Sequence, residues 1–429
     1  MPYLLFWVAY AGFAAFHVVR TARAVLGRNA GQLADLGKDL EIRDFEGFWR
    51  CALRMQQGEI MYFPQTAQRL EVPCKHGPFF ELMLRPLLPL GAAWAEIVFS
   101  TLSFGLLALT IPLTQRLLDR ASGTATPRWL PWVALIAASP FVHLAAAYSQ
   151  TVFLMMFLWI AGLGCFAKRP FAAGLLFALP AAIKLLPLVA LPWLLWRRSW
   201  LAALGMTVGL VATTAVVIAD QGLELGNRQA KAYAHMLRVD PVYDTYHERF
   251  QSLAPLILGT ITPKYEAAIV STTQKTDWNG TRNFLASESS MAHGHEIVLG
   301  ACLLLVLACA FACRPRGCDT FRTLLGEAGL LLIAMLQVTP HTFKHYFWWH
   351  LPALAFALVE ARERRLWAWL FCIVYALTQS LPHRGLLPST WAQAFHVFHG
   401  FAAGQILLCV LLALRLGLDS TRVKSEARG

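Results

Sequence analysis

Residues 95–113 read AEIVFSTLSFGLLALTIPL, an apolar run long enough to cross the hydrocarbon core of a bilayer as one helix. Residues 296–313, EIVLGACLLLVLACAFAC, are equally apolar. Similar runs recur along all 429 residues, of which 57% are hydrophobic and only 14% are charged. Such runs are typical of membrane-spanning helices rather than of alternating barrel strands. We therefore expect an all-α polytopic membrane protein of one domain, with about 11–12 transmembrane or half-membrane helices.

Basic residues mark the loops that we expect on the cytoplasmic side. They lie between apolar runs and in the C-terminal tail, at residues 116–128, 168–169, 197–198, 314–322, 362–365 and 415–428. Positively charged loops tend to stay inside, so the other loops should face the periplasm or the extracellular space of a bacterial inner or plasma membrane. Two of these outer loops are long, at residues 20–78 and 220–295. The net charge of +12 is spread over short loops, a pattern that does not indicate nucleic-acid binding.

Two segments depart from simple spans. Residues 171–196 lie between two basic loops but contain Pro180, Lys184 and Pro187 near their middle, which predicts a hairpin of two short helices with Lys184 close to the outer surface. In residues 33–61, apolar side chains recur with helical spacing beside charged ones, which predicts an amphipathic helix at the membrane interface. That helix would hold Asp44 at the depth of the lipid headgroups.

The predicted topology places the polar candidates on one side of the membrane, as an active site built from loops requires. A lipid-linked sugar phosphate would need a carboxylate to accept a proton from the attacking hydroxyl and cations to neutralise the departing phosphate. Asp44 suits the first role. The candidates for the phosphate are Lys184, His341, Lys344 and His345, and further candidates for substrate contacts are Glu46, Lys75, His76, His143, Gln251 and Ser252. The competing interpretation is that Asp44 pairs with Arg43 or Arg54 and that Lys184 only reaches to the membrane surface.

Five stretches, in chain order, resemble glycosyltransferase family 87. They are DFEGFWRCALRMQQGEIMYFP at residues 44–64, KHGPFFELMLRPLLPL at 75–90, AAIKLLPLVALPWLLWRRSW at 181–200, FQSLAPLI at 250–257 and the run Lys344-His345-Tyr346. The resemblance implies a membrane-embedded GT-C fold, a polyprenyl-phosphate sugar donor, most often mannose, and a lipid or glycan acceptor. It also implies that Asp44 is the general base and that transfer inverts the anomeric centre.

The chain departs from the family pattern in two places. Residues 75–78 lack the tyrosine and the paired prolines that are common there, and Glu46 does not form the paired acids of some related transferases. We therefore expect neither a metal nor another cofactor. The nine cysteines include no Cys-x-x-Cys pair, and we expect those in apolar runs to pack without metal, at positions 165, 302, 309, 372 and 409.

A transporter or flippase of a lipid-linked or anionic solute is the alternative function. Broken helices with charges near the membrane surface also occur in transporters. A transporter should show two similar halves and ionisable residues near the middle of the membrane. The sequence shows no such repeat, and its charges collect on one side, which favours the transferase.

Overall fold

The computed structural model describes residues 2–26, 44–62, 74–244, 251–261, 291–313, 320–339, 342–383, 387–388, 390–392, 395 and 399–426. Within these ranges the regular structure is helical and contains no β-sheet, which confirms the all-α prediction. The elements, in chain order, are α1 (Pro2–Leu26), α3 (Asp44–Gln56), α4 (Pro78–Leu84), η1 (Arg85–Leu90), α5 (Gly91–Ser122), α6 (Leu130–Ala137), α7 (Ser139–Ala147), α8 (Val152–Phe166), α9 (Pro170–Ile183), η2 (Leu186–Val189), α10 (Ala190–Trp196), α11 (Trp200–Gln221), α12 (Leu223–Asp244), α13 (Leu253–Ile261), α16 (Met291–Ala312), α17 (Phe321–Val338), η4 (Lys344–His350), α18 (Leu351–Arg362), α19 (Leu366–Tyr375), η5 (Ala376–Ser380) and α21 (Gly400–Glu426).

Full-length and half-length apolar helices build the bundle together. In the described part of the chain, 5 helices are long and apolar enough to cross a membrane, and α6 with α7 makes a sixth if the bent pair counts as one span. Shorter apolar helices of 10–17 residues, such as α8 and α9, complete the set. The protein is a multi-pass integral membrane protein.

Close helix packing depends on small residues, as is usual in membranes. The α9–α11 pair shows this most clearly. A Cβ atom at Gly174 of α9 would lie 2.0 Å from the carbonyl oxygen of Ala202, and one at Gly205 of α11 would lie 2.1 Å from that of Phe171. The main core is rich in large buried rings, among them Trp159, Trp348, Trp349 and Phe356.

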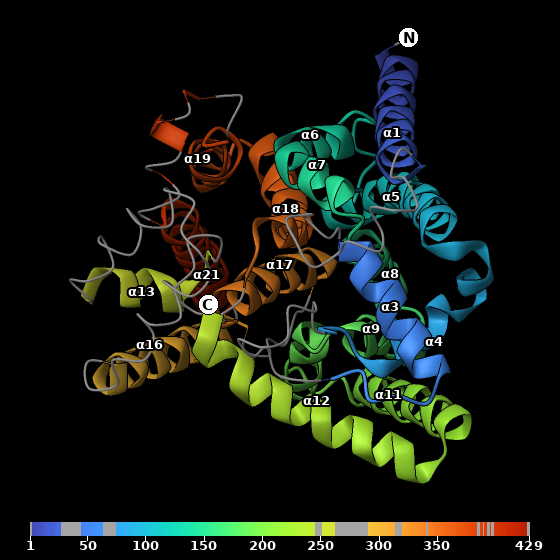
Figure 1. Cartoon of the computed structure of the whole chain (residues 1–429). Coiled ribbons are helices and arrows are strands. Elements are labelled where there is room, and N and C mark those ends of the chain that lie inside the picture. The colour runs from blue at the N-terminus through green and yellow to red at the C-terminus, as the bar shows by residue number, and fades with distance from the viewer. Residues whose placement is uncertain are drawn as a thin grey trace.

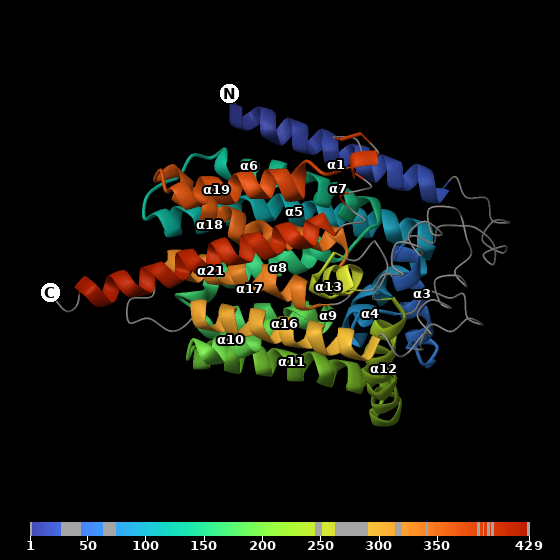
Figure 2. The ribbon, with the colours of Figure 1, turned by 90° about the vertical axis from the view of Figure 1, so that its left-hand side faces the viewer.

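The basic loops meet at one end of the bundle. Arg120 donates to the carbonyl oxygen of Gly164, and Arg322 donates to that of Ala121 at 2.9 Å. Arg322 and Arg415 both pair with the buried carboxylate of Glu360, at 3.2 and 2.9 Å. Figure 2 shows α3, α4 and α12 at the opposite end from the C-terminus. The charge pattern therefore divides the bundle into a basic end and an end that carries Asp44.

The predicted hairpin at residues 171–196 is confirmed. Helix α9 ends at Ile183, Lys184 takes an extended conformation with φ −148° and ψ 134°, and the chain continues in η2 and α10. Pro180 lies inside α9, and Pro187 is the second residue of η2, in the first turn, where a missing N–H costs nothing.

Other boundaries differ from the sequence prediction. The interfacial helix α3 covers residues 44–56 only, because the chain turns at Gly58, whose φ is +73°; residues 33–43 lie outside the described part. Residues 131–147 form two helices at 62° instead of one, with Pro140 in the first turn of α7. Helix α1 continues to Leu26, and the segment 220–295, predicted as an outer loop, contains α12, which lies across one end of the bundle (Figures 1 and 2).

Candidate active site

Asp44 is the first residue of α3, and its carboxylate accepts a hydrogen bond from the side-chain amide of Gln150. Gln150 follows α7 and is buried, in a turn where Ser149 takes a positive φ of 51°. The N-terminal end of a helix favours a negative charge. Gln150 and the start of α3 therefore hold Asp44 as an oriented carboxylate. Glu46, the neighbouring acid, pairs instead with Arg50 one turn along α3, at 2.7 Å.

Lys184 lies at the break after α9 and donates a hydrogen bond to the hydroxyl of Tyr346 on η4. Its Nζ lies 4.3 Å from the centroid of that ring. Desolvation of the ammonium group lowers the pKa of Lys184 to about 7, and the charge of Lys75 acts in the same direction. The carboxylate of Asp44 opposes this shift, so Asp44 and Lys184 lie within each other's electrostatic reach.

Two buried histidines flank Lys184. The Nε2 atom of His76 lies 3.3 Å from the hydroxyl of Thr151, and the ring of His345 contacts that of Tyr346 with centroids 4.2 Å apart. Burial lowers the pKa of both imidazoles well below the usual value, and the charge of Lys184 adds to this effect, so both rings are neutral near pH 7.

The histidines also present unused polar atoms. Nδ1 of His76 and Nε2 of His345 are buried and have no hydrogen-bond partner among the described residues. Buried polar groups are nearly always satisfied in folded proteins, so two orphaned ring nitrogens beside a buried lysine indicate a place for a polar ligand. A neutral imidazole N–H can donate to a phosphate oxygen.

Gly77 allows the His76 segment to lie against the end of α9. Its N–H donates to the carbonyl oxygen of Ile183 at 2.8 Å, and a Cβ atom at this position would lie 2.2 Å from the carbonyl oxygen of Ala182. The hydroxyl of Tyr62 donates to the carbonyl oxygen of His76 at 2.8 Å. These contacts fix His76 beside the chain break that carries Lys184.

A disulfide joins Cys51 of α3 to Cys74, the residue before Lys75. The sequence analysis did not predict this bond. The Cys-x-x-Cys criterion does not apply to partners 23 residues apart. The available signal was position, because both cysteines lie in the long loop predicted between the first two spans, whereas most of the others lie in apolar runs.

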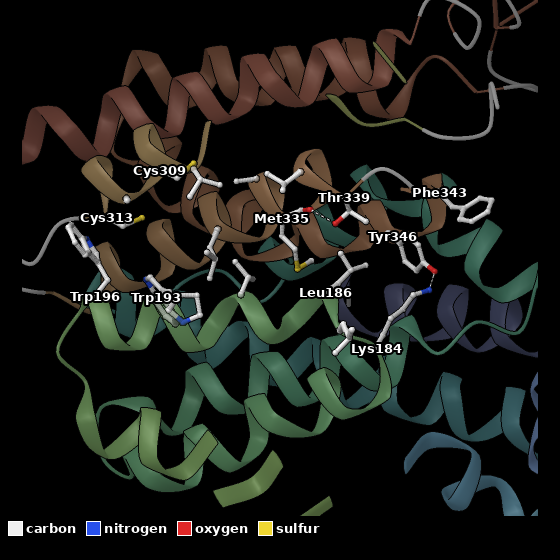
Figure 3. A pocket seen from close by; sticks show the side chains of 18 of the residues that line it. Lys184, Leu186, Trp193, Trp196, Cys309, Cys313, Met335, Thr339, Phe343 and Tyr346 are labelled. Atoms are coloured by element: carbon white, nitrogen blue, oxygen red, sulfur yellow. Dashed lines mark hydrogen bonds between the residues drawn. The ribbon is translucent and has the colours of Figure 1, made fainter. Parts of the chain in front are cut away.

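A cavity of about 640 Å³ begins at the lysine and runs along the bundle. Lys75, Lys184, Phe343 and Tyr346 line one end of it. Figure 3 shows Lys184 and Tyr346 at that end, Leu186 and Met335 along the walls, and Trp193, Trp196 and Cys313 at the other end. Apart from the lysine end, the lining is almost wholly apolar.

The structure brings Asp44, Lys75, His76, Lys184 and His345 together, and it adds three residues that had no predicted role in the site: Gln150, Thr151 and Tyr346. Gln150 and Thr151 lie between α7 and α8 and Tyr346 lies in η4, and each contacts a partner far away in the sequence.

The other predicted site residues have contacts outside the cluster around Asp44 and Lys184, or lie outside the described residues. The Nδ1 atom of His143 on α7 is 3.1 Å from Nε2 of His17 on α1, and Nζ of Lys344 lies 5.4 Å from the Phe401 ring centroid. Gln251 and Ser252 are buried, and the N–H of Gln251 donates to the carbonyl oxygen of Thr342 at 2.8 Å. His341 lies outside the described residues. No group of three or more His, Cys, Asp or Glu side chains placed to hold a metal was found in the described part of the chain.

Comparison with known proteins identifies the family. The model of glycosyltransferase family 87 matches residues 76–340, more than half of the chain. The chain belongs to glycosyltransferase family 87. It is therefore a membrane glycosyltransferase, and the resemblance noted in the sequence is confirmed. The matched residues of this family 87 enzyme include His76 and Lys184, whereas Asp44 and His345 lie outside them.

A relative with a described activity is similar over most of its length. It is the polyprenol-phosphate-mannose-dependent alpha-(1-2)-phosphatidylinositol mannoside mannosyltransferase of Mycolicibacterium smegmatis, which is 27% identical over 365 residues. The match covers 76% of the family 87 enzyme described here and 73% of the relative. No solved structure matches the chain.

Proposed function

We propose that this glycosyltransferase moves mannose from a polyprenyl-phosphate donor to a hydroxyl group of a lipid or glycan acceptor. The observation that carries the proposal is the position of Lys184 at one end of a long apolar cavity, with His76 and His345 close enough for the lysine charge to lower their pKa values. The mycobacterial relative, by its name, uses polyprenol-phosphate mannose and a phosphatidylinositol mannoside acceptor. An anionic lipid acceptor of that kind is our proposal for this chain too.

The cavity suits a ligand with a polar head and an apolar tail. The wall formed by η2 and α10, residues 186–196, extends about 16 Å from Lys184, roughly half the thickness of a hydrocarbon core. A phosphate at the lysine end would meet Lys184, and the unused nitrogen atoms of His76 and His345 belong to side chains within the electrostatic reach of that lysine. A prenyl chain would then lie between η2, α10, α16 and α17.

The proposed reaction is a single displacement. The carboxylate of Asp44 takes the proton of the acceptor hydroxyl as its oxygen forms a bond to the anomeric carbon. The bond from that carbon to the phosphate oxygen breaks, and its electron pair stays on the phosphate. Lys184 stabilises the increased negative charge, and the neutral histidines donate hydrogen bonds to it. Attack opposite the leaving group inverts the anomeric centre.

We place this reaction on the outer side of the membrane. The basic loops lie at the end of the bundle away from α3, and positively charged loops favour the cytoplasmic side. The Cys51–Cys74 bond supports the same orientation, because disulfides persist in oxidising compartments such as the periplasm.

The test of the proposed function is a donor panel with the purified enzyme in lipid nanodiscs. The panel contains the polyprenyl phosphates of mannose, glucose and arabinose and the nucleotide forms of the same three sugars. Each donor is offered with a set of lipid acceptors. We expect mass spectrometry to find transfer of a hexose from polyprenyl-phosphate mannose, and NMR to show an inverted anomeric centre. Transfer from a nucleotide sugar alone would refute the donor assignment.

Filling the cavity should weaken use of long-chain donors. Ala334 of α17 is buried in the cavity wall, and Ala334→Trp would occupy the space proposed for the prenyl chain. We expect the KM for a long-chain donor to rise about tenfold or more, since misfitted bulk in a packed site costs about 1–3 kcal/mol. A donor with a much shorter chain should be affected less.

The matched control is Leu303→Trp on α16. Leu303 is 56% exposed on the bundle surface and does not line the cavity. The KM of the Leu303→Trp variant for the long-chain donor should stay near that of the wild type. Equal KM values for both variants and for the wild type would remove the cavity as the site of the prenyl chain.

A further inference from the structure

We infer that the Cys51–Cys74 disulfide is a positioning device of the active site, which holds Asp44 in register with the donor-phosphate residues, and that full activity requires the bond. This inference rests on the proposed function, because it assumes that Asp44 acts on an acceptor while Lys184 and His76 hold the donor. It concerns two residues that do not themselves touch either substrate.

Helix geometry ties Cys51 to the base. Asp44 and Cys51 lie seven residues apart on α3, nearly two full turns, so they share one face of the helix about 10 Å apart. A bond at Cys51 therefore restrains the helix face that presents the carboxylate. Rotation or sliding of α3 would move both residues together.

Cys74 ties the other side of the bond to the donor residues. It directly precedes Lys75, which lines the cavity mouth, and His76, which lies beside Lys184. The ring of Phe48 on α3 also contacts the ring of His76, with centroids 4.4 Å apart. The disulfide is the covalent link between these two segments near the site.

These contacts form a closed ring around the proposed reaction centre. It runs from Asp44 along α3 to Cys51, through the disulfide to Cys74 and His76, from His76 to Thr151 at 3.3 Å, and from the adjacent Gln150 back to Asp44. Its other two links are hydrogen bonds between side chains, one of them long. Opening the covalent link leaves the relative position of the carboxylate and the cations to those hydrogen bonds and to the packing of Phe45 and Ala52 of α3 in the main core.

The packing directly around the bond is limited. Among the described residues, Cys51 and Cys74 belong to a minor hydrophobic cluster, separate from the main core, with five other buried members, Met55, Met61, Tyr62, Val217 and Met236, and four partly buried ones, Phe79, Leu82, Ala232 and Tyr233. Gln229 of α12 supports this cluster through hydrogen bonds to the N–H of Met61 at 3.1 Å and the carbonyl oxygen of Glu59 at 2.7 Å. Small cores commonly depend on disulfides for their order.

Reduction of the purified, folded enzyme is the direct test. Dithiothreitol donates two electrons and two protons to the bond, giving the thiols of Cys51 and Cys74 and the cyclic disulfide of the reagent. We expect kcat to fall about 10- to 100-fold, because a shift of about 1 Å in a catalytic group costs this much. Removal of the reductant and oxidation with glutathione disulfide should restore kcat.

The readout must separate positioning from stability. Assays are run well below the unfolding temperature, and circular dichroism and gel filtration verify that the reduced enzyme stays folded and monodisperse. A bond with only a structural role would lower the unfolding temperature and leave kcat of the folded enzyme unchanged. A positioning bond lowers kcat itself.

Two variants complete the test. Cys51→Ser with Cys74→Ser should show the low kcat of the reduced enzyme and no further response to dithiothreitol. Cys165→Ser with Cys372→Ser changes two free cysteines within apolar helices and should behave as the wild type, including its response to the reductant. Should the double serine variant at 51 and 74 not fold, the reduction of wild-type enzyme still decides the question.

Failure of this inference differs from failure of the proposed function. Unchanged kcat after verified reduction, or free thiols at both positions in the purified active enzyme, would overturn the positioning role. No transfer by the oxidised enzyme from polyprenyl-phosphate mannose would instead overturn the proposed donor, whatever the state of the disulfide.

Discussion

Asp44→Asn should lower kcat about 10²- to 10⁴-fold, the range expected when a general base is lost. Asparagine keeps an acceptor oxygen for the amide of Gln150 and suits the start of a helix, so α3 and its surroundings should remain in place. The KM for the donor should change little, because Asp44 acts on the acceptor hydroxyl. Initial rates with the purified variant, together with its thermal unfolding, measure both expectations.

Glu59→Gln is the matched control. Glu59 is an exposed carboxylate just beyond α3, and its described hydrogen bond uses the backbone carbonyl group, which the substitution keeps. This variant should retain the wild-type kcat. If Asp44→Asn also did so, another group would have to accept the proton.

The sequence allowed the fold class and the break at Lys184 to be predicted because both depend on local properties. Apolar runs of spanning length dictate helices in a membrane, and two prolines flanking a lysine inside such a run dictate an interruption. The outer placement of Asp44 followed from alternating crossings between basic loops, and it remains a prediction. None of these steps required knowledge of which helices pack together.

The partners of the polar residues could not be predicted, since they depend on packing between distant segments. His143 was grouped with the other candidates by its side of the membrane, but the crossing of α1 and α7 sets it against His17. Lys344 and His345 are adjacent in the chain, yet η4 directs one toward Phe401 and the other toward Tyr346. A one-dimensional topology gives the side of the membrane but not the direction of a side chain.

The composition of the donor site explains why a single group should control its pH dependence. His76 and His345 are held neutral near pH 7 by burial and by the charge of Lys184, so they can donate hydrogen bonds without adding charge. A phosphodiester keeps its single negative charge over the same range. Lys184, whose pKa is lowered to about 7, is then the group at the cavity mouth that changes charge near neutral pH.

We therefore expect kcat/KM for the donor to fall as the pH rises through about 7. A lysine is charged below its pKa and neutral above it, and only the charged form attracts the phosphate. Bound phosphate stabilises the ammonium group, so kcat at saturating donor should persist to higher pH than kcat/KM does. Both parameters are measured against pH with polyprenyl-phosphate mannose as the donor. The profiles check that kcat/KM falls with rising pH and that kcat falls only at a higher pH.

Substitutions at Lys184 separate charge from shape. Lys184→Met should lower kcat/KM about 10- to 100-fold below pH 7, since a hydrogen bond to a charged group contributes about 1.5–3 kcal/mol, and it should remove the decline at higher pH. Lys184→Arg keeps its charge throughout and should also lose the decline, with a higher remaining activity than the methionine variant. Lys168→Met, at the exposed opposite end of α9, should leave the whole profile unchanged. A profile in Lys184→Met that still falls near pH 7 would assign the titration to a different group and leave Lys184 as a packing residue at the cavity mouth.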